Sequence, residues 1–373
     1  MRYRNRDWST LALACVAMLA GCSPAASPAG STGRSAPTVP AASAPAPRAP
    51  AAAPAPTPAG PKEPVHVGWV RSINIGPFFV ALGKGYYEQE GLTIEESEFR
   101  SAADIVGALG TGQMDVNLGT ISAGTFNAWQ RGVKMIVGAP TSLYAAEGLM
   151  PTHVVVRKDL YDSGAVRSAA DFRGRKLAMN VRGGINELVV MRVLERRGLT
   201  MDDVEIATMP FPDMVPALAN GSIDVMTPPD PFATIAIDQG TGVRLEDDQK
   251  SVGEIQTVHM LFSENFATAR ADVAVRFLVA TMRAAREMQG NWLADPTKAK
   301  IIEDEVGIKG DLLARMILPT YPQDMLTRPE DVQLFQDAFL RLGHLGYSTP
   351  IDVTPFVNTT LAQRARAQLD ARR

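Results

Sequence analysis

Six short segments of the sequence carry the glycine, hydroxyl, amide and guanidinium groups that could bind a small molecule. They are 71–76, 100–104 and 119–122 in the first half of the chain, and 181–186, 210–213 and 227–230 in the second. None matches a P-loop, a nucleophile elbow or a helical metal-ligand motif. The four histidines are far apart in sequence, although distant residues could still meet in space. The pattern favours ligand binding over catalysis.

Arg71, Arg100 and Arg182 are the candidate counter-ions for an anionic ligand, because a guanidinium group presents paired donors to an oxyanion. Any single arginine more often lies on the surface, so we expect one of the three to contact the ligand. The candidates for hydrogen bonds to it are Ser72, Asn74, Gly76, Ser101, Thr120, Ser122 and Asn186.

Several of these residues also have a purely structural interpretation. Ser101 begins a Ser-x-x-Asp capping pattern. Gly183 and Gly184 allow close backbone approach to an anion ahead of a helix, but could form only a tight turn; we favour the anion contact. Asp230 could accept a hydrogen bond from a ligand amine or cap the next helix. The aromatic residues that could line a cleft or simply belong to the core are Trp69, Tyr144 and Phe232.

A repeat indicates how these segments are positioned. Residues 104–116 follow the pattern Asp-x-Val-x-Ala-Leu-x-x-Gly-x-x-Asp-Val, and residues 213–225 follow it again. Each copy is preceded by Gly-Leu-Thr, a helical pattern and a short apolar strand. The order β-α-β-α-β therefore occurs twice, which is typical of parallel sheets with helices on both faces.

The first unit predicts strands at 66–70, 92–99 and 115–118 and helices at 77–89 and 102–109. The second predicts strands at 176–180, 204–209 and 224–226 and helices at 186–197 and 214–220. Two such units predict an α/β protein of two lobes, 63–152 and 153–262, with a ligand cleft between them at the carboxyl ends of the strands.

Apolar strands at 153–157 and 257–262 are the candidates for the two crossings that join the lobes. Residues 263–373 are predicted to return to the first lobe and to end in helices, including 271–293 and 329–342. We assign this helical tail to the outer side of the first lobe.

The N-terminus has the organisation of a secretory signal. Three arginines precede an apolar run of about ten residues, half of what a membrane-spanning helix needs. The run ends in Leu-Ala-Gly-Cys22, which resembles the bacterial lipobox, so residues 1–21 are predicted to be removed and Cys22 to carry lipid. Residues 22–62 contain eleven prolines and few large apolar side chains, which predicts a disordered tether.

Composition excludes several classes of protein. With 37 basic and 40 acidic residues the chain lacks the positive charge that nucleic-acid binding requires. The two cysteines, Cys15 and Cys22, both lie at the N-terminus, so the remaining chain can form no disulfide, thiolate metal site or catalytic thiol. No cofactor is predicted.

Four segments carry a family resemblance: 76–93 (GPFFVALGKGYYEQEGLT), 112–116 (GQMDV), 171–177 (DFRGRKL) and 221–225 (GSIDV). In this order they resemble the substrate-binding proteins of ABC importers for nitrate, sulfonates, taurine and thiamine-pyrimidine precursors. The resemblance implies a type II periplasmic-binding-protein fold that closes like a hinge on one small molecule and presents it to a membrane permease.

Together these features predict a monomeric lipoprotein, anchored outside the cytoplasm through Cys22. It is predicted to bind a small organic anion, which is sulfonate-, taurine- or nitrate-like or pyrimidine-like, for an ABC permease. Two alternatives remain open. One is an enzyme on the same fold that acts on a small carboxylate outside the cytoplasm. The other is a ligand sensor that docks to a membrane kinase.

Overall fold

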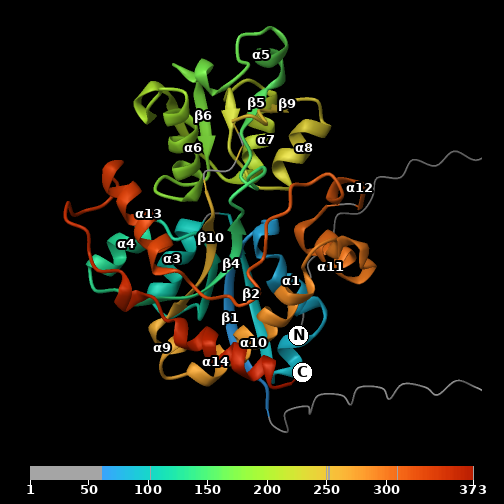
Figure 1. Ribbon diagram of the computed structural model, residues 1–373, viewed down its shortest axis with the longest axis vertical. Helices are drawn as coiled ribbons and strands as arrows, with labels where there is room; N and C mark the ends of the chain where they lie inside the picture. Colours follow the sequence, from blue (N-terminus) through green and yellow to red (C-terminus); the bar gives the residue numbers. More distant parts are fainter. Residues whose placement is uncertain (1–60, 101, 249, 251–252, 309, 373) are drawn as a thin grey trace, which may run out of the picture. The chain divides into compact units, whose positions relative to one another are not determined.

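The computed structural model describes residues 61–100, 102–248, 250, 253–308 and 310–372. The predicted signal peptide, Cys22, nearly all of the tether and Ser101 lie outside these residues. Figure 1 shows two sheets, one above the other, each with helices packed around it. We call the sheet with β1 and its helices lobe 1, and the sheet with β6 and its helices lobe 2.

Both sheets have five strands and the same topology. Sheet 1 has the order β2-β1-β3-β10-β4 and sheet 2 the order β7-β6-β8-β5-β9. The strands of sheet 1 are β1 (Glu63–Val70), β2 (Leu92–Phe99), β3 (Val116–Gly119), β4 (Met135–Tyr144) and β10 (Ile255–Ser263). Those of sheet 2 are β5 (Val155–Arg157), β6 (Lys176–Met179), β7 (Glu205–Thr208), β8 (Val225–Met226) and β9 (Gly242–Arg244).

The repeat correctly predicts this duplication, and the strands predicted in the two units agree with the structure except that β1 begins three residues earlier and the others differ by at most one residue at either end. The sheets are mixed, however, and not wholly parallel. In sheet 1, β10 runs antiparallel to β3 and β4, and in sheet 2, β5 runs antiparallel to β8 and β9. Each antiparallel strand is the first that the chain forms after it has passed from one sheet to the other.

The chain leaves sheet 1 after Tyr144 and enters sheet 2 at Val155, then leaves sheet 2 after Arg244 and returns to sheet 1 at Ile255. The chain therefore passes from sheet 1 to sheet 2 over residues 145–154 and returns between Arg244 and Ile255, a stretch in which 249, 251 and 252 are not described. The strands predicted as crossings lie next to these segments, inside the sheets.

Fourteen helices occur in the described part of the chain. In lobe order of the sequence they are α1 (Gly76–Gly83), α2 (Tyr86–Gln89), α3 (Ala102–Gly110), α4 (Ala123–Gln130), α5 (Lys158–Asp162), α6 (Ile185–Arg196), α7 (Phe211–Ala219), α8 (Phe232–Asp238), α9 (Glu264–Ala267), α10 (Ala271–Glu287), α11 (Pro296–Val306), α12 (Gly310–Leu313), α13 (Pro329–Arg341) and α14 (Thr359–Asp370). Short 3-10 helices are η1 (Ile73–Ile75), η2 (Ala169–Phe172), η3 (Met201–Asp203), η4 (Trp292–Ala294) and η5 (Thr354–Phe356).

Two of the predicted helices are shorter than expected. The single helix predicted at 77–89 is divided into α1 and α2 by Gly85, whose φ of 69° is left-handed and ends a helix. The helix predicted at 271–293 ends at Glu287 as α10, and η4 follows it.

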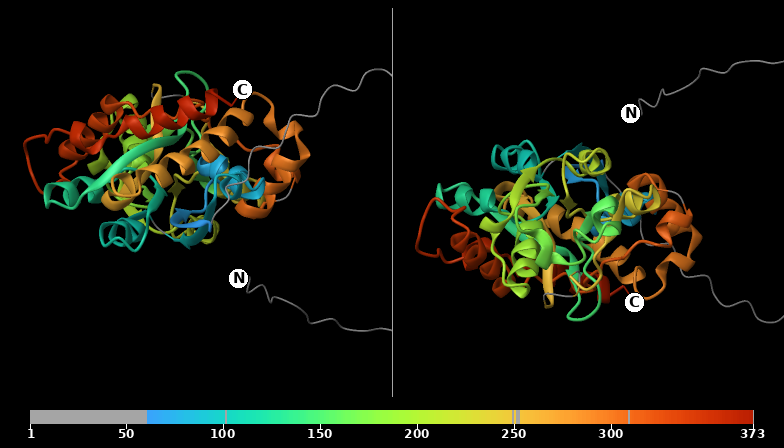
Figure 2. Two further views of the ribbon diagram at one scale, coloured as in Figure 1. Left: turned by 90° about the horizontal axis from the view of Figure 1, so that it is seen from below. Right: turned by 90° about the horizontal axis from the view of Figure 1, so that it is seen from above.

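Most of the C-terminal helices pack on lobe 1, as expected. Helix α10 packs against α1 and α14, and its Phe277 stacks on Tyr87 with ring centroids 4.9 Å apart. Helix α13 differs from that expectation because it packs against both α4 of lobe 1 and α6 of lobe 2. Figure 2 shows these orange and red segments at the periphery in both end-on views. Within the described residues no helix has the length and apolar character needed to cross a membrane.

Candidate functional site

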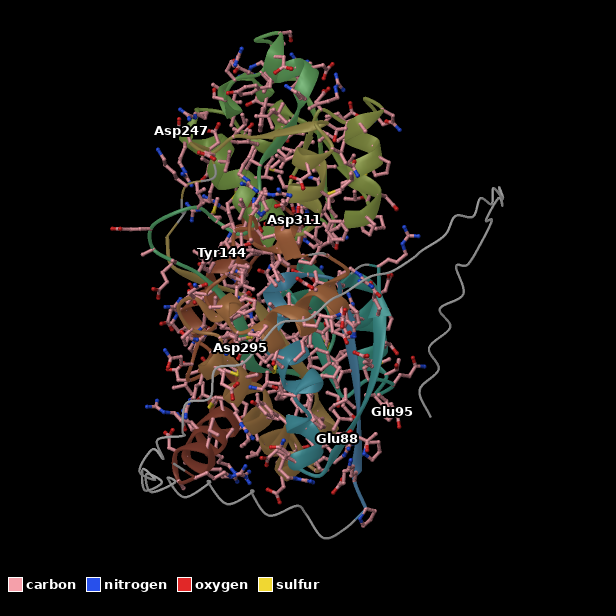
Figure 3. All side chains as sticks on the ribbon, turned by 90° about the vertical axis from the view of Figure 1, so that its right-hand side faces the viewer. Glu88, Glu95, Tyr144, Asp247, Asp295 and Asp311 are labelled. Carbon is pink, nitrogen blue, oxygen red and sulfur yellow. The ribbon has the colours of Figure 1, made fainter. Side chains whose placement is uncertain are left out.

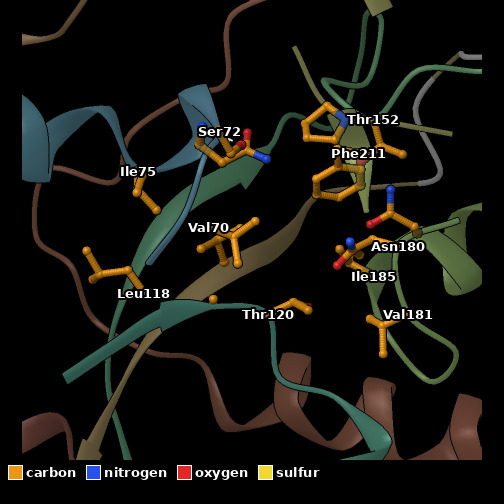
Figure 4. A pocket seen from close by; sticks show the side chains of 15 residues that line it. Val70, Ser72, Ile75, Leu118, Thr120, Thr152, Asn180, Val181, Ile185 and Phe211 are labelled. Atoms are coloured by element: carbon orange, nitrogen blue, oxygen red, sulfur yellow. Dashed lines mark hydrogen bonds between the residues drawn. The ribbon is translucent and has the colours of Figure 1, made fainter. Parts of the chain in front are cut away.

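A cavity lies between the two lobes, at the carboxyl ends of the strands. The space between its atoms amounts to about 540 Å³, a figure that includes open solvent. Figure 4 shows Val70, Leu118 and Thr120 of lobe 1 on one side and Asn180 and Ile185 of lobe 2 on the other. The lining residues are Val70, Ser72, Asn74, Ile75, Leu118, Gly119, Thr120, Thr152, Asn180, Val181, Ile185, Asn186, Phe211, Pro229 and Val258.

Five of the six candidate segments converge on this cavity. They are 71–76, 119–122, 181–186, 210–213 and 227–230, and only 100–104 contributes no described lining residue. The convergence follows from the fold, because the two duplicated sheets turn the carboxyl ends of their strands toward the same space.

Four of the candidate polar residues line the cavity: Ser72, Asn74, Thr120 and Asn186. The Ser72 hydroxyl accepts a hydrogen bond from the Asn74 backbone N–H at 3.1 Å, which fixes the turn after β1. The Asn186 amide nitrogen donates to the Thr227 carbonyl oxygen, which ties α6 to the end of β8.

The three candidate arginines do not line the cavity, and each is paired with a carboxylate. Arg71 donates to Glu98 at 2.6 and 2.9 Å. One Arg100 nitrogen lies 2.8 Å from both carboxylate oxygens of Asp213, which is on α7 of lobe 2. The Arg182 Nε lies 3.3 Å from Glu187.

The Gly183–Gly184 turn holds a carboxylate that the chain itself supplies. The Gly183 N–H donates to Glu187 Oε2 at 2.5 Å, and His344 Nε2 lies 2.8 Å from the same oxygen. Glu187 is fully buried in the first turn of α6. A carboxylate at the start of a helix receives N–H groups and the positive end of the helix dipole, so Glu187 occupies the position at which the sequence predicted a ligand anion.

Gly183 also joins the lobes. Its φ is +66°, and its carbonyl oxygen accepts a hydrogen bond from the Ala123 N–H of lobe 1 at 2.6 Å. A Cβ atom at Gly183 would lie 2.3 Å from Ala123 Cβ. This position therefore requires glycine both for its backbone conformation and for the approach of the two lobes.

The model of the NMT1-like family matches residues 58–303, about two thirds of the chain. The chain belongs to the NMT1-like family. A candidate binding protein of Bacillus subtilis, YtlA, is 22% identical to it over 307 residues, which are 80% of this chain and 88% of the relative.

Solved structures show that this NMT1-like protein has a periplasmic-binding-protein fold of type II, as the sequence predicted. The alkanesulfonate-binding protein SsuA of Xanthomonas axonopodis pv. citri, bound to MOPS, has a TM-score of 0.64 at 18% identity and covers 80% of this chain and 99% of its own. The nitrate-binding protein NrtA of Synechocystis has a TM-score of 0.69 at 15% identity, with 83% and 90% covered.

Other candidates of the NMT1-like chain have structural positions behind the cavity. Ser122 caps α4 by accepting from the Thr125 N–H at 3.4 Å. Gly76 lies against Tyr321, whose hydroxyl oxygen would be 2.6 Å from a Cβ there. Figure 3 shows Tyr144 midway along the molecule. Its buried hydroxyl is hydrogen-bonded to Thr152, a lining residue, and burial raises the pKa of Tyr144.

Asp230 is fully buried beside the lining residue Pro229. Its carboxylate accepts from the Thr234 hydroxyl at 2.7 Å and the Ile317 N–H at 3.0 Å, and lies 3.0 Å from the His153 ring. Burial alone would raise the pKa of Asp230, but His153 and the Thr234 hydrogen bonds outweigh it and hold this pKa below its usual value. Asp230 thus connects three parts of the chain: the first crossing through His153, α8 through Thr234 and the C-terminal region through Ile317.

Trp69 and Phe232 are buried in the packing around the site and are not among the lining residues. Trp69 meets the edge of Phe79 with ring centroids 5.1 Å apart. Phe232 stacks on Phe211, a lining residue, at 6.0 Å between centroids and 25° between planes. Phe232 therefore supports the cavity through Phe211, whereas Trp69 belongs to the core of lobe 1.

Sequence reasoning did not single out several lining residues. One of them is Asn180, the last residue of the strand predicted at 176–180. Its position directly before the candidate segment 181–186 is the sequence feature that could have indicated it. Thr152 comes from the first crossing and Val258 from β10 of sheet 1. Nothing in their local pattern distinguishes them from ordinary strand residues. In the described residues no group of three or more His, Cys, Asp or Glu could hold a metal ion.

Proposed function

We propose that this chain is the extracytoplasmic substrate-binding lipoprotein of an ABC importer, which captures a small molecule between its lobes and delivers it to a permease. The observation that carries the proposal is the cavity lined by both lobes at the carboxyl ends of their strands. The similar folds of an alkanesulfonate-binding and a nitrate-binding protein support it. The ligand that the sequence predicts is a small organic anion, sulfonate-, taurine- or nitrate-like or pyrimidine-like.

Capture is proposed to occur by hinge closure. The proposed hinge is residues 145–154 together with the described residues between Arg244 and Ile255. Around the cavity, lobe 1 meets lobe 2 through the Ala123–Gly183 hydrogen bond, the Arg100–Asp213 ion pair and a hydrogen bond from the Ile73 N–H to the Asp230 carbonyl at 3.4 Å. These contacts stabilise the closed conformation around a ligand.

The proposed organisation is a signal peptide at 1–21, a lipid-bearing Cys22 with a tether to residue 62, lobe 1 at 63–152, lobe 2 at 153–262 and the return to lobe 1 at 263–373. Extended polyproline-type chain spans about 3.1 Å per residue, so a tether of this length reaches on the order of 100 Å from the membrane. That reach lets the lobes meet a permease while the lipid stays in the bilayer.

Uptake into cells tests the proposal. The protein is purified from its own cells, and the bound molecule is released by denaturation and identified by mass spectrometry. Deleting the gene is expected to abolish high-affinity uptake of that molecule in labelled form, and the wild-type gene to restore it. Uptake unaffected by the deletion would refute an importer role, and conversion of the molecule by the purified protein would indicate an enzyme.

Replacing Cys22 with serine is expected to move most of the protein from the membrane fraction to the soluble fraction, because the serine variant lacks the thiol that carries the lipid. Immunoblots of fractionated cells measure this distribution. Cys15→Ser, seven residues earlier in the predicted signal peptide, is the matched control and is expected to leave the protein membrane-bound. A Cys22→Ser protein that stayed with membranes would contradict lipid anchoring.

Replacing Gly184 with valine is expected to weaken ligand binding about tenfold by filling part of the cavity. A Cβ atom there would lie 2.9 Å from Val181 and 3.6 Å from Thr120, both lining residues. The backbone of Gly184 is extended (φ −125°), so valine adds no backbone strain and thermal unfolding of the ligand-free protein is expected to change little. Isothermal titration with the recovered molecule measures the affinity; an unchanged value would remove this turn from the site.

A further inference from the structure

Two amide side chains at the cavity have hydrogen-bonding atoms without a partner. The Asn74 carbonyl oxygen accepts no hydrogen bond and the Asn180 amide nitrogen donates none, although Asn74 is only 5% and Asn180 only 8% exposed. Asn74 lines the cavity from lobe 1 and Asn180 from lobe 2. Folded proteins pair nearly all their buried polar atoms, so these two amides point to a ligand that pairs with them.

The cavity offers an anion no counter-charge. Among the described lining residues none is Lys, Arg or His, and none is Asp or Glu. The nearby arginines are neutralised by Glu98, Asp213 and Glu187, as described above. A charge moved from water into such a space loses its hydration without a compensating partner, which favours a ligand without net charge.

The first turn of α6 cannot supply the missing charge stabilisation. Glu187 already accepts the Gly183 N–H and lies beside both Arg182 and His344. A ligand anion at this turn would meet a fully buried carboxylate and would be repelled by it.

Most of the remaining lining is apolar and includes one aromatic ring; its polar members are Ser72, Thr120, Thr152 and Asn186. Val70, Leu118 and Val258 come from sheet 1, and Phe211 and Ile185 from lobe 2. The Phe211 ring is held in place by its stacking on Phe232. Figure 4 shows Phe211 close to Asn180, opposite the lobe 1 side chains. A largely apolar wall, a fixed ring and an unpaired amide atom from each lobe match a flat molecule that carries a hydrogen-bond donor and an acceptor.

We propose that the ligand is a small, uncharged, planar molecule with both a hydrogen-bond donor and an acceptor, as in an aromatic carboxamide, a lactam or a cyclic urea. Its donor pairs with the Asn74 oxygen, its acceptor with the Asn180 amide, and its face packs on Phe211. The two amides complement such a ligand in either orientation of their oxygen and nitrogen atoms. This assignment rests on the proposed function and replaces the anion that the sequence predicts with an uncharged ligand.

Matched pairs of compounds test the ligand class on the purified full chain carrying Cys22→Ser. Nicotinamide is compared with nicotinate, and benzamide with benzoate, by thermal shift and isothermal titration at pH 7. The carboxamide of at least one pair is expected to raise the melting temperature and to bind at least tenfold more tightly than its carboxylate. Equal or tighter binding of the carboxylates, or no binding of either carboxamide, overturns the assignment.

Side-chain variants test the two amides. Asn74→Leu and Asn180→Leu are each expected to weaken carboxamide binding at least tenfold, without lowering the melting temperature of the ligand-free protein, because each removes an unpaired buried polar group. Asn117→Leu is the matched control. Asn117 is a fully buried amide of β3 that also lacks partners but does not line the cavity. Carboxamide binding unchanged in both cavity variants, or reduced equally by Asn117→Leu, overturns the assignment.

The uptake experiment separates this inference from the proposed function. A recovered molecule that is anionic at pH 7 and whose uptake depends on the gene overturns the ligand class and leaves the importer in place. A carboxamide that binds in titration, with uptake independent of the gene, overturns the importer and leaves the ligand class in place.

Discussion

Replacing Gly183 with alanine is expected to weaken ligand binding by about 5- to 150-fold, which corresponds to an overpacking cost of 1–3 kcal/mol. The new Cβ atom would lie 2.3 Å from Ala123 Cβ and 3.2 Å from the Ala123 backbone nitrogen. Backbone atoms cannot rotate away as a long side chain can, so the lobes must separate to relieve the clash. Because the ligand is proposed to bind between closed lobes, destabilising closure lowers its affinity.

Gly174→Ala is the matched control for this variant. Gly174 lies in the same lobe with a φ of +70°, close to the +66° of Gly183, but no atom lies within 4 Å of a Cβ at that position. Both variants pay a left-handed backbone strain of roughly 1 kcal/mol in stability. Only Gly183→Ala is expected to lose affinity for the recovered molecule in isothermal titration. Equal affinity losses in the two variants would show that the effect is strain and not closure.

The duplicated architecture could be predicted because the repeated pattern at 104–116 and 213–225 covers a helix and the start of the strand after it in each lobe. Strand β4 was not predicted, since Gly138 and Pro140 interrupt its apolar pattern. The structure accommodates both residues. Pro140 lies in the edge strand of sheet 1, where irregular pairing with β10 tolerates a missing N–H, and the space of a Gly138 side chain is filled by Phe262. Such compensation comes from another part of the chain, so local patterns do not reveal it.

At the candidate site, sequence reasoning identified the segments better than the individual side chains. Strand ends can be located from periodicity, and five of the six predicted ends reach the cavity. Arg100 and Asp213 are 113 residues apart in sequence, and their pairing depends on how the two lobes meet. The role of Glu187 depends on its folding back to Gly183 and on His344 arriving from the C-terminal region. The sequence pattern therefore predicted a ligand anion at the Gly183–Gly184 turn, where the folded chain places the carboxylate of Glu187.

Replacing Asp230 with asparagine is expected to lower the free energy of unfolding by about 1–3 kcal/mol at pH 7, because an amide cannot accept all the hydrogen bonds that this buried carboxylate accepts and leaves buried donors unpaired. Asp230 is fully buried and its Oδ2 faces both His153 and the Ile317 N–H. An asparagine amide nitrogen at the position of Oδ2 would point its N–H groups at the Ile317 N–H and the His153 ring. Urea denaturation of the two proteins measures the difference.

Asp238→Asn provides a control on the same helix, α8. Its carboxylate is 38% exposed and pairs with Arg315, and an exposed pair of this kind contributes about 1 kcal/mol or less. A loss of under about 1 kcal/mol in Asp230→Asn as well would contradict the role assigned to the buried carboxylate.

The pH dependence of stability provides a second test of Asp230. The pKa of this carboxyl is lowered in the folded protein from an ordinary value of 3.8. A group whose pKa is lowered by folding contributes its full stabilisation above the unfolded pKa, and that contribution is lost as the pH falls through the folded pKa. The difference between wild type and Asp230→Asn is therefore expected to stay constant from roughly pH 8 to 5 and to narrow below about pH 4. A difference that narrowed between pH 7 and 5 instead would assign the effect to another titrating group, since Asp230 stays ionised throughout that range.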